Sequence, residues 1–477
     1  MKLKVVDKLY SEKTRILMFL VVFIINTLSS FIFPNLISSA LSTILYITLL
    51  VFILRVSPIA LLIFSPIIFL HLSVLISLNS IESGAYMKEV GRFGHASTAS
   101  STYFLVVSLF LIAALAIFHF TEKKRVYNSK QFIINQYPFL FKRIAIVIIC
   151  FIIFYLFVKG LVSGFPLLDK TDRYAYRQES ADKLTIYFLN LKLVLAAFLS
   201  LSKTNCVSRN YKLQYDVVFT LYIIVSFLFG DKFFSIITGV LFYIGVQLSR
   251  DHDERKKNMN KFFLYGVIAL LFAFLVTFFV YSNHGEIGFL DTLELFGERF
   301  SEQGQLWFVT YNDNSKWIDF DSDAVEKNIN SLFYIPAIDY VFDNHLGPFH
   351  FVYRYSPSEI VTAFEANNGY VGPVMGFEAY GLELFGFIGL FFVAISAGGL
   401  MGLIGHFIMN AISSSNPVNI ILPVYFFTQF YYLIVSENIS LILGLGPLKA
   451  YLAMYILKLL VSSWIYRKDR VILTKFN

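Results

Sequence analysis

Twelve stretches of this chain are long and apolar enough to cross a bilayer as helices. Only 15% of the residues are charged, whereas soluble domains carry about 25%, and the mean hydropathy is +0.66. The sequence therefore predicts an all-α polytopic membrane protein with about twelve transmembrane helices. The expected spans are 15–33, 36–54, 57–78, 101–120, 143–159, 184–202, 216–230, 233–249, 261–281, 385–409, 418–436 and 440–466.

The basic residues predict the orientation, because cytoplasmic loops are enriched in Lys and Arg. With the N-terminus inside, 24 of the 39 Lys and Arg fall in cytoplasmic segments and 12 in external ones. Both termini are therefore expected in the cytoplasm. Segments 80–99, 160–183 and 282–384 are expected to face outward. The net charge of +7 follows from this bias and does not indicate nucleic-acid binding.

These spans divide the chain into three parts. A membrane domain of about nine spans, 1–281, includes the external loop 160–183. A hydrophilic extracytoplasmic loop, 282–384, holds sixteen carboxylates and four cations. A membrane domain of about three spans follows at 385–477. Apolar residues at helical spacing over 290–307, up to Trp307, predict an amphipathic helix on the membrane surface.

The number and type of charged residues inside the expected spans limit the classes of membrane protein to which the chain can belong. No Asp or Glu is expected well inside a span, which counts against an ion-coupled carrier, because such carriers usually need buried carboxylates. Lys192 is the clearest charge within a span. It either faces a polar cavity that holds an anionic ligand, or it snorkels or pairs with carbonyl groups.

Two arginines stand four residues apart in the external loop 160–183. On a helical turn, Arg173 and Arg177 would share a face. Two guanidinium groups on one face suit a phosphate group, because each binds oxygens bidentately. The alternative is a surface pair that the neighbouring carboxylates neutralise.

The stretch 345–378 combines His345, His350, Arg354 and Glu378 with aromatic residues, prolines and glycines. Aromatic faces beside carboxylates suit sugar rings, and the mixture suits acid–base chemistry; the alternative is an ordered loop without a ligand. The spacing fits no zinc motif. The acidic run 319–323 lacks the glycine and the final glutamate of a calcium loop, so we expect no metal.

The order of these features resembles the Wzy-type polymerases, which polymerise the oligosaccharide repeat units of bacterial surface polysaccharide. The resemblance rests on Gly164-Phe-Pro-Leu-Leu168 before Arg173 and Arg177, and on Gly230-Asp-Lys232 opening a span. It also rests on the single large external loop and on Glu378-Ala-Tyr380 leading into Gly386-Phe-Ile-Gly389. The family often has arginine where this chain has Lys232.

The resemblance implies a metal-independent glycosyltransferase with a GT-C-like fold in the bacterial inner membrane, acting in lipopolysaccharide biosynthesis of the O-antigen type. Its substrates are oligosaccharides linked to undecaprenyl pyrophosphate. No cofactor is needed, and a chain-length regulator is a possible partner. Arg354, Arg173 and Arg177 are expected to stabilise the leaving pyrophosphate, and His350 or Glu378 to act as the base. The expected substrate-binding residues are Lys232, Arg299, His345 and Lys192.

Alternative functions remain. An O-antigen ligase would share the topology and the chemistry. A flippase for lipid-linked oligosaccharides would have two similar halves and short loops, which this chain lacks. A non-enzymatic chain-length or scaffold component would not require so many spans.

Overall fold

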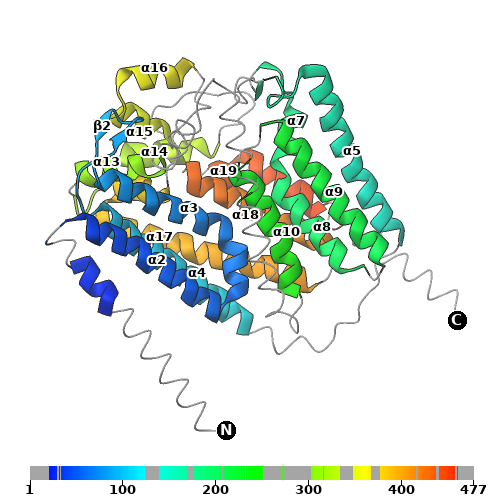
Figure 1. The fold of residues 1–477 in the computed structure, drawn as a ribbon, viewed down its shortest axis with the longest axis horizontal. Helices are drawn as coiled ribbons and strands as arrows, with labels where there is room; N and C mark the ends of the chain where they lie inside the picture. Colours follow the sequence, from blue (N-terminus) through cyan, green and yellow to red (C-terminus); the bar gives the residue numbers. More distant parts are fainter. Residues whose placement is uncertain are drawn as a thin grey trace, which may run out of the picture.

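A computed structural model gives the fold of the chain (Figure 1). It describes residues 21–28, 34–123, 139–169, 176–177, 179–206, 208–230, 233–250, 302–314, 316–333, 348–366, 376–414, 417–436 and 440–456, with isolated positions 32, 271, 275 and 459. Arg173, Lys232, Arg299 and His345 lie outside the described residues, as do most of the predicted spans 15–33 and 261–281.

Helices dominate the described part of the chain, and the one sheet in it is a short antiparallel hairpin, β1 (Tyr86–Met87) with β2 (Arg92–Phe93). The first half contains α2 (Leu36–Val56), α3 (Pro58–Glu82), α4 (Ala99–Lys123), α5 (Phe139–Ser163), α7 (Lys183–Asn190), α8 (Lys192–Thr204), α9 (Arg209–Leu228) and α10 (Phe233–Arg250). The second half contains η1 (Glu302–Gly304), α13 (Gln305–Asp313), α14 (Ser322–Ser331), α15 (Pro348–Tyr355), α16 (Ser358–Ala366), α17 (Phe377–Ser413), α18 (Pro417–Ser436) and α19 (Ser440–Leu443).

Seven of the described helices are long and apolar enough to cross a membrane: α2, α3, α4, α5, α9, α17 and α18. The pair α7 and α8 makes an eighth span if it is counted as one helix, bent by 50°. The all-α polytopic membrane class is therefore confirmed. The count of twelve, the GT-C-like fold and the orientation of the termini stay predictions.

Helix α17 packs closely along α4. At the point of closest approach, α17 has glycines, which carry no side chain. Gly398 and Gly402 are four residues apart, and a Cβ at either position would collide with a carbonyl oxygen of α4, from Phe110 or Ala114 respectively. Small residues at this spacing let two helices approach to backbone contact, which is a common way to pack helices in a membrane. The closeness of α4 and α17 therefore depends on these glycines.

Helix α17 is broken near its start. Gly386 has φ 66° and ψ −172°, outside the helical region, and a positive φ of this size is uncommon for residues with a side chain. A break leaves carbonyl groups before it and N–H groups after it without helical partners. The segment before α14 supplies those partners: the N–H groups of Asp319 and Asp321 donate to carbonyls before the break, and N–H groups after it donate to the carbonyls of Lys316 and Trp317.

The predicted first span of the C-terminal membrane domain, 385–409, thus belongs to a helix that begins eight residues earlier, at Phe377. The first helical segment of α17 falls inside the residues expected to form the external loop. Because of this, two carboxylates of that loop, Glu378 and Glu383, are carried by a candidate span. Both are buried.

Polar side chains also cross the interior of the bundle between α2, α3 and α4. Ser39 Oγ lies 2.9 Å from Ser100 Oγ, and Ser100 Oγ in turn donates to Glu82 Oε2 at 2.7 Å. Ser97 Oγ donates to the other oxygen of Glu82 at 2.9 Å. Hydrogen bonds between helices satisfy polar groups that lipid or apolar side chains could not.

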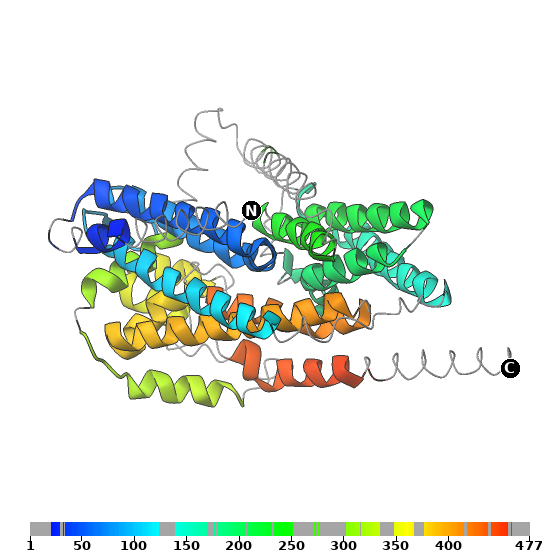
Figure 2. The same ribbon diagram turned by 90° about the horizontal axis from the view of Figure 1, so that it is seen from below.

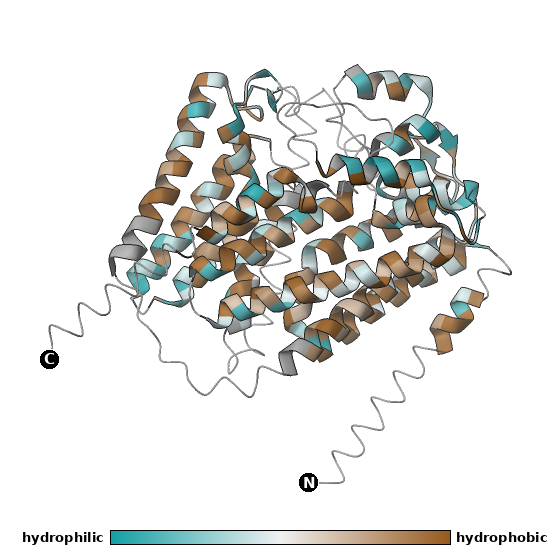
Figure 3. Cartoon of the chain, turned by 180° about the vertical axis from the view of Figure 1, so that it is seen from behind, coloured by the Kyte–Doolittle hydropathy of each residue, from teal (hydrophilic) through white to brown (hydrophobic). Residues whose placement is uncertain are grey.

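The smaller elements gather at one end of the bundle, where Figure 1 labels β2, α13, α14, α15 and α16. Colouring by hydropathy shows the same division, with apolar helices along the bundle and hydrophilic residues concentrated at this end (Figure 3). The broken start of α17 reaches into it. The expected amphipathic helix over 290–307 is described only from residue 302, and Trp307 is wrongly assigned to the membrane surface. Its indole N–H donates to the carbonyl of Ala99 at 3.1 Å, so it is buried in the core.

Candidate functional site

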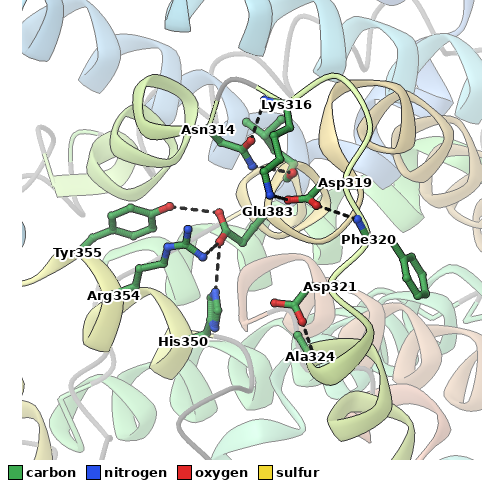
Figure 4. Close-up of polar contacts among 11 residues, drawn as sticks. Asn314, Lys316, Asp319, Phe320, Asp321, Ala324, His350, Arg354, Tyr355 and Glu383 are labelled. Atoms are coloured by element: carbon green, nitrogen blue, oxygen red, sulfur yellow. Dashed lines mark hydrogen bonds and ion pairs between the residues drawn. The ribbon is translucent and has the colours of Figure 1, made fainter.

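The candidate site joins α15 to the first segment of α17. His350 and Arg354 are four residues apart on α15 and therefore share a helix face. That face meets Glu383, three residues before the break at Gly386. Figure 4 shows the three side chains converging, with Tyr355 completing the group. We call these four residues the Glu383 cluster.

Both oxygens of Glu383 have partners. Arg354 Nη1 donates to Oε1, and His350 Nε2 lies 3.6 Å from the same oxygen. The hydroxyl of Tyr355 donates to Oε2 at 3.1 Å. A buried carboxylate needs such partners, because an unpaired charge away from water is costly.

The members of the cluster differ in exposure, and the difference decides what each can do. The side chain of Glu383 is only 3% exposed and that of His350 9%, whereas that of Arg354 is 53% exposed. A guanidinium has five N–H donors in a fixed fork. Arg354 can therefore hold Glu383 through Nη1 and still present donors to an anionic ligand from the solvent side.

Tyr355 contributes a hydrogen-bond donor. Burial raises the pKa of its hydroxyl well above the ordinary value, and the neighbouring Glu383 carboxylate raises that pKa further. The phenol therefore keeps its proton at neutral pH and donates to Glu383 throughout that range. Its ring also lies beneath Arg354, with the guanidinium carbon 5.5 Å from the ring centroid, a cation–π distance.

A second cation stands beside the cluster on the segment that bridges the break. Lys316 Nζ lies 2.8 Å from Asp319 Oδ2, and Figure 4 shows this pair next to Glu383. The hydrogen bond from Lys316 lowers the pKa of Asp319, and the charge of Arg354 contributes to the same shift. In the sequence, Lys316 is one of the four cations of the loop 282–384, and nothing there predicts a role for it.

Glu378 belongs to a different environment. Its Oε1 lies 3.2 Å from His71 Nε2, and both side chains are 1% exposed. The His71 ring makes edge-on contacts with Tyr103 of α4, Phe110 of α4 and Phe377 of α17. We call Glu378 and His71 the buried pair. Its surroundings are aromatic and buried, whereas the Glu383 cluster reaches the solvent through Arg354.

Within the described residues, three carboxylates are buried near the ends of candidate spans. Glu378 and Glu383 are buried on α17, and Glu82 is buried in the last turn of α3. A buried carboxylate is tolerated there because another element supplies hydrogen bonds or an opposite charge. Those partners come from distant parts of the chain and cannot be read from the local sequence.

Two other expected site residues are described. Lys192 is the first residue of α8, at the bend after α7, and its side chain is buried with the methylene groups against Gly239 of α10. Arg177 is half-buried and lies shortly before α7. In Figure 1 the start of α7 lies at the upper right of the molecule and α15 at the upper left.

Within the described residues, no group of three or more His, Cys, Asp or Glu side chains could hold a metal ion. The sequence predicts no catalytic or binding role for three members of the two sites: Glu383, Tyr355 and His71. The sequence shows Glu383 between Glu378 and the Gly386 motif, but it does not show that Glu383 is the partner of His350 and Arg354. Comparison of the chain with protein-family models, with curated proteins and with solved structures finds no match.

Proposed function

We propose that the chain is a glycosyltransferase that polymerises oligosaccharide repeat units carried on undecaprenyl pyrophosphate. The observation that carries this proposal is the Glu383 cluster. It combines a half-exposed arginine with a nearly buried histidine on one helix face, both fixed by one buried carboxylate. This cluster stands at the hydrophilic end of a candidate membrane span, where the headgroup of a lipid-linked substrate would lie.

In the proposed reaction, a hydroxyl of the incoming repeat unit attacks the anomeric carbon of the growing glycan. The new carbon–oxygen bond forms as the bond to the pyrophosphate breaks, and undecaprenyl pyrophosphate leaves with the electron pair. Arg354 would stabilise the negative charge that develops on this leaving group, because its exposed donors can bind two phosphate oxygens. Lys316 would add a second positive charge nearby.

The hydroxyl proton needs an acceptor, and His350 is the candidate in the cluster. Glu383 faces Nε2 of His350 at 3.6 Å, so we propose that this carboxylate orients the imidazole that accepts the proton. Glu378 was an alternative base. Its burial beside His71 supports a structural role instead, so we propose His350 alone.

The donor already contains the energy of the reaction in its pyrophosphate ester, so the proposed mechanism needs no nucleotide. A purified-protein assay tests it directly. Protein in lipid nanodiscs is incubated with a lipid-pyrophosphate-linked repeat unit, and products are separated by mass. Lipid-linked oligomers of two or more repeats are expected, and release of monomer without oligomers would contradict polymerisation.

The same question can be put to cells. A deletion strain in which single repeat units cap the lipid core supports a polymerase. Loss of all capping would instead indicate a ligase, and accumulation of cytoplasmic lipid-linked units would indicate a flippase. Complementation with the intact gene is the control, because it must restore the long chains.

A further inference from the structure

A group of large apolar side chains is exposed outside the candidate spans. Trp317 and Ile318 precede α14, with 69% and 74% of their surfaces exposed, and Phe320 follows them at 63%. Ile329 of α14 and Phe333 just after it are also more than half exposed. We call these five residues the apolar loop surface. Large exposed apolar side chains of this kind often mark a surface that contacts a membrane or another protein.

The apolar loop surface is fixed to the broken helix. The carbonyl of Trp317 accepts a hydrogen bond from the N–H of Ile388 at 3.1 Å, just after the break in α17. The indole ring lies 5.7 Å from the ring of Phe387, and the ring of Phe320 lies 6.1 Å from that of Phe385. The loop and the start of the second segment of α17 therefore form one unit.

This attachment makes the apolar loop surface continuous with the outer face of a membrane span. Ile388, Phe392 and Ile395 follow one another at helical spacing on α17, and all three are exposed. In a helix that crosses a bilayer, such a stripe faces lipid. Trp317 stands at the head of that stripe, hydrogen-bonded to its first residue.

Helix α14 has the pattern of a helix that lies along a membrane surface. Asp321 caps its N-terminus by accepting from the N–H of Ala324 at 2.9 Å, and Ala324 is buried. Val325 and Ile329 recur at helical spacing, Leu332 follows them at the C-terminus, and these three residues form the apolar face of the helix. Exposed Glu326 stands at the border of that face. None of the described helices packs along α14, and Figure 2 shows it, in yellow-green at the lower left, at the outer edge of the molecule.

We propose that residues 316–333 are an interfacial anchor whose apolar loop surface inserts into the headgroup region of the bilayer. Tryptophan and amphipathic helices favour this region, where an apolar body and a polar backbone can both be satisfied. Glu383 precedes the break at Gly386 by three residues, so the anchor also sets the depth of the Glu383 cluster relative to the lipid headgroups. The inference stands on this geometry whether or not the proposed function is correct.

Quenching of tryptophan fluorescence by brominated phospholipids tests the anchor. The protein is reconstituted into vesicles with bromine either near the headgroups or near the chain ends, and the wild type is compared with Trp317→Phe. The difference between them is the signal of Trp317, because the change leaves the other two tryptophans in place. We expect Trp317→Phe to lose the emission component that headgroup-proximal bromine quenches most.

Two variants in the Trp317→Phe background calibrate how the quenching depends on the depth of a tryptophan in the bilayer. Phe392→Trp, about 9 Å farther along α17 than Gly386, should be quenched most by bromine near the chain ends. Glu359→Trp, on the exposed surface of α16, should respond to aqueous acrylamide and not to brominated lipid. If Trp317 behaves like Glu359→Trp, water covers the surface and the anchor is wrong. If neither lipid nor acrylamide quenches Trp317, protein covers it, and the anchor is equally wrong.

Discussion

Glu378 and Glu383 are the same residue type, five positions apart on one helix, and the structure gives them opposite surroundings. Glu378 faces His71 among aromatic rings in the interior. Glu383 is also buried, but the side chain of its partner Arg354 is half exposed to solvent. Burial alone therefore does not tell a functional carboxylate from a structural one. The exposure of the partner does, because a ligand can reach only a partner that solvent can reach.

The buried pair should have the largest effect on stability. His71→Leu removes the nitrogen that lies 3.2 Å from Glu378, and loss of one partner of a buried pair costs about 3–5 kcal/mol. Thermal unfolding in detergent is the measurement. The double variant His71→Leu, Glu378→Gln removes the charge as well, and should recover most of that loss.

Turnover per folded molecule of the same double variant tests whether Glu378 and His71 take part in the reaction. We expect the double variant to retain polymerising activity, because in our proposal the buried pair does not touch substrate. A double variant that folds normally and makes no product would contradict the contrast between the two carboxylates. It would place Glu378 or His71 in the reaction.

Arg354→Ala should have the next largest effect, and mainly on activity. Loss of an electrostatic contact to the leaving group typically costs ~10²–10³ in rate, and Arg354→Lys should recover activity only in part, since lysine lacks the fork. The loss of activity is measured as the length distribution of the glycan on gels and as turnover in nanodiscs. The variant also leaves Glu383 with one partner fewer, so some loss of stability is expected.

Two controls separate these effects. Arg354→Ala combined with Glu383→Gln removes the buried charge, and should restore stability without restoring activity. Arg92→Ala breaks another arginine–carboxylate pair, with Asp313, in which both side chains are exposed. Exposed pairs contribute little, so Arg92→Ala should polymerise normally. Normal polymerisation by Arg354→Ala itself would remove this residue from the proposed site.

These contrasts also define what could be predicted from the sequence. Long apolar runs predict helices such as α2 and α3 well, because a helix in lipid must satisfy its own backbone. His350 and Arg354 could be singled out because local composition makes them unusual. Their common partner Glu383 could not, since a hydrogen bond between α15 and α17 depends on how the helices pack. The break at Gly386 likewise depends on distant backbone partners.

The break itself can be tested with Gly386→Ala. The φ of 66° is unfavourable for alanine, and the new Cβ would stand 2.9 Å from the carbonyls of Lys316 and Trp317. Strain of this kind costs about 1–3 kcal/mol, and activity should fall too, because Glu383 would shift. Gly399→Ala is the matched control. Its Cβ would meet only Ile117 at 3.9 Å, so stability and activity should both stay at the wild-type level.

The smallest effect is expected for Tyr355→Phe, which keeps the ring and removes one hydrogen bond to Glu383. A hydrogen bond to a charged group contributes about 1.5–3 kcal/mol, and the lower limit is expected because Arg354 still pairs with Glu383. Because burial and Glu383 both raise the pKa of Tyr355, the hydroxyl is a donor at every pH near neutrality. The stability difference between wild type and variant should therefore be constant across that range, as measured by thermal unfolding at several pH values. A difference that disappears below neutral pH would contradict this prediction, because it would mean that the hydrogen bond depends on the titration of a group other than Tyr355.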